Sequence, residues 1–179
     1  RDLHSFPTRR SSDLTIDDYV RTGRFDNVRI ATKHEAILTE RQRYLYELSR
    51  RPDGQSKAQF LREAVKDRLN FLIVGGTGSG KTTIAKAIAD IFPPERRYIT
   101  VEDVPEMSLP LHPNHIRLFY KKNTVEAKEI IEACMRLKPD HIFLAELRGN
   151  EAWSYLEALN TGHEGSISTI HANNTYASF

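Results

Sequence analysis

The sequence has a single cysteine and no long apolar run. With only Cys134, no disulfide can form within the chain, which is typical of a protein from a reducing compartment. No stretch approaches the roughly 20 apolar residues that cross a bilayer, and no secretory signal pattern is present. The formal net charge of +2 is too small for the overall field to attract nucleic acid. These shortages predict a cytosolic protein with no evident nucleic-acid site.

What is present fits a globular protein with unusual ends. Hydrophobic residues make up 39% and charged residues 28%, and 179 residues suffice for one domain and part of another. The chain begins at Arg1 rather than a methionine, and residues 4–14, "HSFPTRRSSDL", resemble a translated sequencing adapter. A natural Ser/Arg-rich disordered leader is the alternative. We expect residues 1–14 to be non-native or disordered and the rest to be an internal fragment of a longer protein.

The segment before residue 69 has helical patterns. Thr15 precedes acidic residues in the manner of a helix cap. Apolar spacing predicts one helix over residues 34–51 and another over 57–69, with a turn at "RPDGQS" between them. We interpret residues 15–68 as the remnant of an N-terminal domain and its linker helices.

A phosphate-binding loop follows at the start of the next segment. The apolar run "FLIV" is a buried-strand pattern, "GGTGSGKTT" follows it directly, and "IAKAIADIF" has helical spacing. This strand, glycine loop and helix match the P-loop pattern G-x-x-x-x-G-K-[ST] from Gly75 to Thr82. A dinucleotide fingerprint does not fit, because Lys81 stands where its third glycine belongs.

The P-loop assigns roles to its residues. Backbone amides of the glycine loop surround phosphate oxygens, and the amino terminus of the next helix adds partial positive charge. Lys81 is expected to reach the β- and γ-phosphates, and the Thr82 hydroxyl to bind Mg²⁺. The predicted nucleotide-binding residues are Gly75, Gly76, Thr77, Gly78, Ser79, Gly80, Lys81, Thr82 and Thr83.

Acidic residues end two further predicted strands. "YITV" runs into "EDVPEM", and a buried strand over residues 142–145 is closed by Glu146. Open α/β sheets place their chemistry at the carboxyl ends of the strands. We interpret Glu102 as a general base for the attacking water, Asp103 as support for the metal, and Glu146 as a Walker B acid that binds Mg²⁺ through water or orients the nucleophile. The alternatives are an acidic turn and a solvated strand end.

Two histidines flank the last predicted strand. "TGHEG" is a glycine turn, "SISTI" is the strand, and His171 stands at its carboxyl end. If this strand neighbours the P-loop strand, His171 lies near the γ-phosphate. His163 precedes the strand and is expected at its other end, nearer a surface or a subunit interface. A structural role for both histidines is the alternative.

Together these four motifs resemble the secretion ATPase superfamily. Its members power type II and type IV secretion, pilus assembly and conjugation, and the similarity covers most of residues 69–179. "EDVPE" and "STIHANN" are most similar to the type IV secretion and DNA-transfer branch. The type II and pilus-retraction branches usually have proline after the Glu-Asp pair, where this chain has Val104.

The resemblance implies both a fold and a function. It implies a RecA-like α/β ATPase domain over residues 69–179, incomplete at its carboxyl end, that hydrolyses ATP with Mg²⁺. The full-length protein is then expected to be a homohexameric motor subunit at the cytoplasmic face of a bacterial inner membrane. Its expected partners are secretion-channel components, with a peripheral membrane contact.

The resemblance also implies residue roles. Glu102 supports catalysis, Glu146 is the Walker B acid, and His163 and His171 sense the γ-phosphate. Members of the superfamily also use arginines from the domain junction and from neighbouring subunits, for which the candidates here are Arg117, Arg136 and Arg148.

Three other functions remain open on the sequence alone. An ATPase of a type II secretion or type IV pilus system shares the same motifs. A P-loop kinase also uses Lys81 and Mg²⁺, but it needs an acceptor site and has no need of the histidines. A nucleotide switch without turnover would lack an activating carboxylate, whereas this chain has Glu102 and Glu146.

Overall fold

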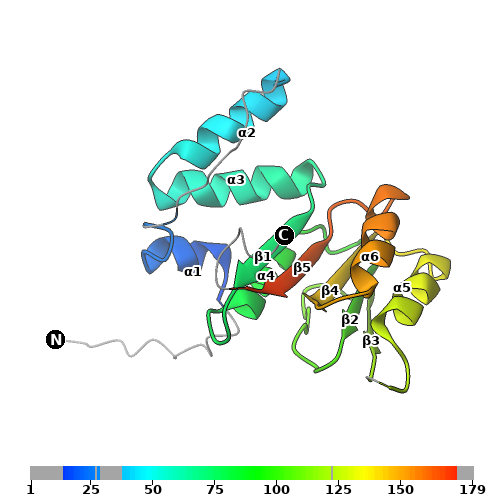
Figure 1. Cartoon of the computed structure of the whole chain (residues 1–179). Helices are drawn as coiled ribbons and strands as arrows, with labels where there is room; N and C mark the ends of the chain where they lie inside the picture. Colours follow the sequence, from blue (N-terminus) through cyan, green and yellow to red (C-terminus); the bar gives the residue numbers. More distant parts are fainter. Residues whose placement is uncertain (1–13, 27, 29–37, 122, 173–179) are drawn as a thin grey trace.

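A parallel five-stranded sheet forms the centre of the structure (Figure 1). The computed structural model describes residues 14–26, 28, 38–121 and 123–172. Within them the strands lie in the order β1-β5-β4-β2-β3, and every pairing is parallel. In chain order the strands are β1 (Phe71–Gly75), β2 (Tyr98–Glu102), β3 (His115–Phe119), β4 (His141–Leu147) and β5 (Ile167–His171). The predicted α/β class is confirmed.

Helices cover both faces of the sheet. Figure 1 shows α5 and α6 side by side at one end of the sheet and α1, α2 and α3 grouped near β1 at the other end. In chain order the helices are α1 (Ile16–Arg21), α2 (Glu40–Arg50), α3 (Gly54–Lys66), α4 (Lys81–Ala89), α5 (Ala127–Arg136) and α6 (Glu151–Asn160).

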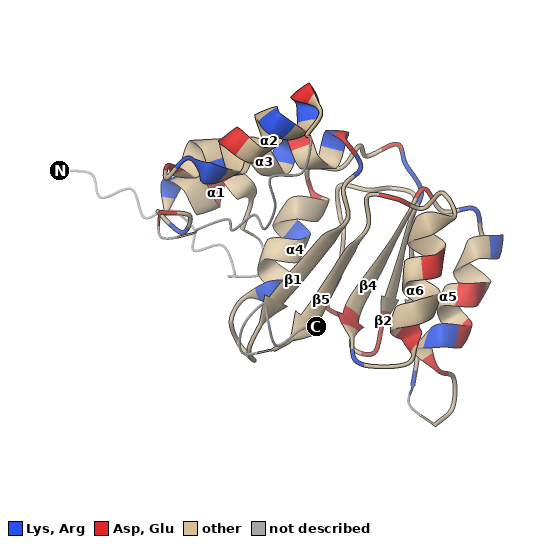
Figure 2. Cartoon of the chain, turned by 45° about the horizontal axis from the view of Figure 1, so that its top comes forward, with Lys and Arg blue, Asp and Glu red and all other residues tan. Residues whose placement is uncertain are grey.

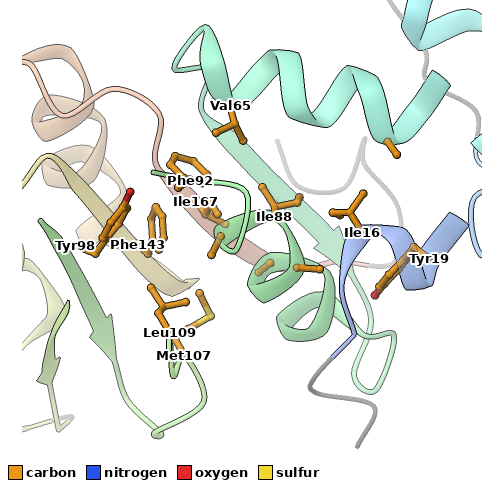
Figure 3. Close-up of a cluster of buried hydrophobic side chains, with 14 of the residues drawn as sticks. Ile16, Tyr19, Val65, Ile88, Phe92, Tyr98, Met107, Leu109, Phe143 and Ile167 are labelled. Carbon is orange, nitrogen blue, oxygen red and sulfur yellow. The ribbon is translucent and has the colours of Figure 1, made fainter. Parts of the chain in front are cut away.

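Two apolar clusters hold these layers together. Because strand side chains alternate between faces, Tyr98 joins the cluster on the α4 side and Ile99 joins the cluster under α5 and α6. Figure 3 shows Tyr98 with Phe143 and Ile167 in the first cluster. Each sheet face is therefore buried, which is usual for a parallel sheet.

The amino-terminal helices share the first cluster. The side chains of Ile16, Tyr19 and Phe25 and those of Ala58 and Val65 pack into the same cluster as the α4 side chains. Figure 3 shows Ile16 and Tyr19 from α1 facing the α4 region. The division of the chain at residue 68 stays a prediction, but the parts on either side of it have one core in common.

Helix boundaries differ from the sequence prediction at two places. The helix predicted over residues 34–51 begins only at Glu40, because Thr39 caps it by accepting a hydrogen bond from the Gln42 amide. Residues 34–37 lie outside the described residues, as do residues 1–13 of the predicted leader. The helix predicted over 57–69 is α3, and it begins inside the predicted turn.

Asp53 explains that earlier start. Its carboxylate accepts a hydrogen bond from the Ser56 amide, so "PDG" caps a helix rather than making a free turn. The helix ends before Arg68, whose positive φ of 54° is incompatible with a continuing α-helix. Across the described part of the chain, no helix is both long enough and apolar enough to cross a membrane.

Candidate functional site

The P-loop lies between β1 and α4, as the sequence predicts. Gly75 ends β1 where a Cβ atom would come within 2.5 Å of the Ser79 hydroxyl oxygen, so a side chain there would clash. Gly80 caps α4 with φ of 87°, a conformation that glycine adopts without strain. No side chain caps the first amides of α4, which leaves them available to an anion.

Two P-loop side chains have defined partners. The Lys81 ammonium donates to the Gly76 carbonyl oxygen at 2.9 Å, so it curls back over the loop. The Thr82 hydroxyl donates to a carboxylate oxygen of Glu106 at 2.9 Å. Glu106 belongs to the motif "EDVPEM" but was not predicted as a site residue, because the sequence drew attention to the acids directly after the strand. Glu106 is a candidate site residue that sequence reasoning missed.

A cavity of about 1280 Å³ adjoins the P-loop. This volume is more than enough for a nucleotide-sized ligand. Its walls come from the P-loop itself, from Glu106 and its neighbours, and from the amino-terminal segment, which contributes Tyr19, Arg24 and Phe25. The segment predicted as an N-terminal remnant therefore forms one wall of the candidate nucleotide site.

Glu102 is fully buried at the end of β2. One carboxylate oxygen accepts from Thr100 Oγ1 at 2.8 Å and from Arg117 Nε at 3.0 Å. The other accepts from Arg117 Nη2 at 3.0 Å and from the amides of Glu106 and Met107, both at 2.8 Å. Burial raises the pKa of Glu102, but the Arg117 guanidinium and these other donors together hold it below its usual range.

This environment does not favour the predicted role of Glu102 as a general base, which stays a prediction. A general base needs an oxygen that faces water or substrate. Both oxygens of Glu102 are occupied by protein donors, and the side chain has no exposed surface. In this geometry Glu102 fastens the loop that follows β2, and it is Glu106 that faces the P-loop.

Glu146 lies where β4 bulges against β5. Leu144 pairs with Ser168 and Leu147 pairs with Ile170, so β4 advances by three residues where β5 advances by two. Strand β4 therefore contains one extra residue at this point. The Thr169 hydroxyl donates to the Ala145 carbonyl oxygen at 2.7 Å and satisfies that group within the bulge. Bulges re-aim side chains near active sites, and the strand continues past Glu146 rather than ending there as predicted.

Arg148 pairs with both remaining acids of the site. Its two terminal nitrogens lie 2.6 Å from a Glu146 oxygen and 2.7 Å from an Asp103 oxygen. The side-chain hydrogen bond to Glu146 raises the pKa of Arg148. Acidic residues mark the ends of β4 and β2 in Figure 2. Asp103, predicted to support the metal, is therefore held by Arg148, whereas it is Glu106 that contacts Thr82.

The two histidines lie at opposite ends of strand β5. Strand β5 neighbours β1, as proposed for His171, and His171 is paired in register with Gly75. Its Nδ1 lies 3.5 Å from Thr77 Oγ1, at the limit of a hydrogen bond. His163 precedes the amino end of β5, and its Nδ1 donates to the Pro139 carbonyl oxygen at 3.0 Å.

This placement does not bring His163 to the P-loop of its own chain, and its nucleotide-binding role stays a prediction. Within one chain the whole length of β5 separates His163 from the P-loop edge, so it cannot contact a phosphate there. Of the three arginine candidates, Arg117 and Arg148 pair within the chain, and Arg136 is exposed at the end of α5.

The Thr82 hydroxyl fits a magnesium ion, because Mg²⁺ prefers oxygen ligands. The Glu106 carboxylate, which accepts the hydrogen bond of Thr82, would lie beside such an ion. The described part of the chain contains no group of three His, Cys, Asp or Glu side chains able to hold a metal by itself. Such an ion would thus need further ligands from phosphate and water, which is usual for Mg²⁺.

Comparison with known proteins identifies the family. The family described as "Type II/IV secretion system protein" matches residues 36–179. The chain belongs to this family. It is 41% identical over 172 residues to the type IV secretion system protein VirB11 of Brucella suis biovar 1 (strain 1330), which covers 92% of this chain and 46% of that protein. It is 46% identical over 132 residues to protein VirB11 of Rhizobium radiobacter, covering 71% of this chain and 38% of that one.

A solved structure agrees with this family membership. The crystal structure of the VirB11 ATPase from the Brucella suis type IV secretion system, in complex with sulphate, matches with a TM-score of 0.69 and 41% identity. The match covers 97% of this chain and 49% of that chain. The predicted RecA-like core and the type IV branch are therefore confirmed. The chain spans about half the length of the curated relatives it matches.

Proposed function

We propose that this chain is the nucleotide-binding core of an ATP-hydrolysing motor subunit of a type IV secretion or conjugative transfer system. The observation that carries the proposal is the Glu106 carboxylate on the Thr82 hydroxyl at 2.9 Å, at the edge of a P-loop cavity. A carboxylate at this place supports hydrolysis rather than binding alone. The VirB11 names of the relatives support the choice of system.

The P-loop residues bind and orient the phosphates. The free amides at the start of α4 and the Lys81 ammonium supply positive charge on one side of the cavity. A Mg²⁺ ion bound beside Thr82 would polarise the phosphate and neutralise part of its charge. Lys81 would exchange the Gly76 carbonyl for a phosphate oxygen when a nucleotide binds.

Glu106 is the proposed general base. It lines the cavity, and the part of the chain that the structure describes contains no ion pair to it, unlike Glu102, Asp103 and Glu146. Its carboxylate would take the proton from a water molecule as that water attacks the terminal phosphorus atom and the bond to the leaving ADP oxygen breaks. Glu146 would orient this water or the metal shell after release from Arg148.

His171 is the proposed contact to the terminal phosphate. Its register beside Gly75 places the imidazole at the P-loop edge, where an N–H can donate to a phosphate oxygen. A contact that exists with ATP and is lost with ADP couples hydrolysis to the position of the segment after β5. His163 holds the Pro139 turn instead.

The partners are proposed on family membership. We expect the full-length protein to form a homohexamer that docks on inner-membrane channel components, with a peripheral membrane contact at the cytoplasmic face. This chain by itself is expected to be mostly monomeric or prone to aggregate. Light scattering on both proteins checks these states, and a stable hexamer of this chain would contradict the second one.

Release of inorganic phosphate by the full-length protein tests the activity. With ATP and Mg²⁺ and no added acceptor, we expect steady turnover, whereas a kinase needs an acceptor and a switch gives none. Glu106→Gln should lower kcat by about 10²-fold or more while ATP still binds, because only the base is lost. Lys81→Ala should weaken ATP binding as well as abolish turnover.

Two outcomes of this experiment contradict the proposal. Parental turnover in Glu106→Gln would remove that carboxylate from the chemistry. Phosphate transfer that appears only with an acceptor would make the protein a kinase. Glu102→Gln serves as the comparison, since it should lower stability as well as kcat.

A further inference from the structure

Glu106 reaches the P-loop only because its backbone is held in place. The segment after β2 has no regular structure, so its position depends on individual contacts. The amides of Glu106 and Met107 both donate to one oxygen of Glu102 at 2.8 Å. The side chain of Glu106 then points to Thr82 from the same stretch of backbone. One buried carboxylate therefore sets where the proposed base lies.

The cation that holds this carboxylate comes from the next strand. Arg117 lies on β3, in register with Thr100 of β2, and it meets Glu102 with two nitrogens at 3.0 Å each. Such two-point pairing fixes the orientation of a carboxylate as well as its position. The Arg117 guanidinium also lies over the Phe119 ring, 5.2 Å from its centre, in a cation–π contact.

Because Glu102 is buried, the position of the segment after β2 depends on the pair that Glu102 forms with Arg117. Glu102 has no exposed surface, so loss of its cation would leave a buried charge with only neutral donors. The carboxylate would then take up a proton or move toward water, and both changes weaken its hold on the two amides. Neither Glu102 nor Arg117 lines the cavity, so neither is placed to touch a nucleotide directly.

We propose that Arg117 is a positioning residue that acts through Glu102 to hold Glu106 against Thr82. The inference rests on the proposed function, because it gives Glu106 the chemical role. Arg117 thus works inside its own subunit, and β3, at one end of the sheet, contributes to the geometry of a site beside β1, four strand spacings away at the other end.

The test uses the full-length protein with three variants. Arg117→Gln removes the cation, Arg117→Lys restores a charge without the two-point geometry, and Arg43→Gln removes an exposed arginine on α2 as a matched control. For each we would measure kcat and KM for ATP, the affinity for a fluorescent ADP, and hydrogen exchange at the amides of Glu106 and Met107.

We expect Arg117→Gln to lower kcat by about 10²-fold, the effect of misplacing a catalytic group by roughly 1 Å. ADP affinity should stay within about two-fold, because the P-loop contacts are kept. The two amides should exchange faster, Arg117→Lys should recover part of kcat, and Arg43→Gln should match the parent.

A double variant distinguishes a positioning role of Arg117 from a general loss of structure. If Arg117 acts through Glu106, Arg117→Gln should cause no further loss of kcat in the Glu106→Gln background. Additive losses, or parental exchange at the two amides in Arg117→Gln, would overturn the proposal. The exchange measurement needs no turnover, so it still tests the positioning if the full-length protein fails to hydrolyse ATP.

Discussion

His141 is a buried imidazole that the proposed chemistry does not use. It stacks on Tyr98 with ring centres 5.3 Å apart and planes 12° apart, and its Nδ1 donates to the Gly165 carbonyl oxygen at 2.8 Å. Burial lowers the pKa of His141 to about 4, and the nearby charge of Arg68 acts in the same direction. The folded protein therefore keeps this ring neutral at a pH where an unfolded chain would protonate it.

The free energy of unfolding should decrease as the pH is lowered through the range between the unfolded and folded pKa values of His141. Between its unfolded pKa of about 6.5 and its folded pKa of about 4, the unfolded state binds the extra proton, so lowering the pH favours unfolding. From pH 7 to pH 5 we expect His141 to account for a loss on the order of 2 kcal/mol in the free energy of unfolding.

Urea unfolding of the parent and of His141→Gln checks this expectation. Burial also lowers the pKa of His115, which contributes with the same sign, so the difference between the two proteins isolates His141. An equal loss in both proteins between pH 7 and pH 5 would show that His141 does not cause it.

At the scale of elements, α1 is a six-residue helix that depends on its cap. The Thr15 hydroxyl accepts from the Asp18 amide, and the Asp18 carboxylate accepts from the Thr15 amide. This reciprocal pairing satisfies two amides at the helix start. Ile16 and Tyr19 extend from α1 into the shared core, and Tyr19 also lines the cavity.

Loss of the cap should therefore reach beyond α1. We expect Thr15→Ala to lower the free energy of unfolding by about 1 kcal/mol, whereas Thr15→Ser keeps the hydroxyl and should differ little from the parent. Chemical denaturation measures both values. Equal stabilities for Thr15→Ala and Thr15→Ser would show that the cap contributes nothing.

At the scale of the whole molecule, the shared core joins the two predicted parts of the chain. Buried side chains from α1 and α3 pack against α4 and Phe92 (Figure 3). Removal of residues 1–69 would expose the face of α4 that these side chains cover. Large apolar surface left uncovered in this way promotes aggregation.

Two truncations compare native with non-native sequence. A chain that begins at Asn70 should lose its cooperative thermal transition, because core members on α1 and α3 are missing. Leu14, the last residue of the predicted leader, packs against the core, contrary to the expectation for residues 1–14, so the second truncation stops before it. A chain without residues 1–13 should keep the parental melting temperature, as expected for an adapter-encoded segment. Thermal circular dichroism measures both, and a cooperative transition in the shorter chain would show that its sheet folds independently.

Local patterns in the sequence predicted the local features well. The P-loop depends on neighbours in sequence, so its strand, glycines and helix were predicted together. The placement of His171 depended on the condition that its strand neighbours the P-loop strand, and β5 does pair with β1. The choice between Glu102 and Glu106 depends instead on Arg117, which reaches across from β3 through a register that no local pattern shows.

The prediction of a nucleotide contact for His163 has a different origin. Its position before the strand already implied the far edge of the sheet, but the resemblance gave both histidines one role. The cap at Asp53 was read as a turn because the same residues, Pro, Asp and Gly, serve both purposes. For His163, its position before the amino end of β5 was thus a better guide than the motif that it shares with His171.

Helix α6 carries the single tryptophan of the sequence. Trp153 is 74% exposed. It lies in the first turn of α6, three residues after the N-cap residue Asn150. An exposed indole emits at long wavelength and is quenched readily by soluble agents. Because no other tryptophan contributes to the emission, any protein or membrane that covers α6 should shift the emission to shorter wavelength and reduce the quenching. The chain therefore contains its own optical reporter for this face.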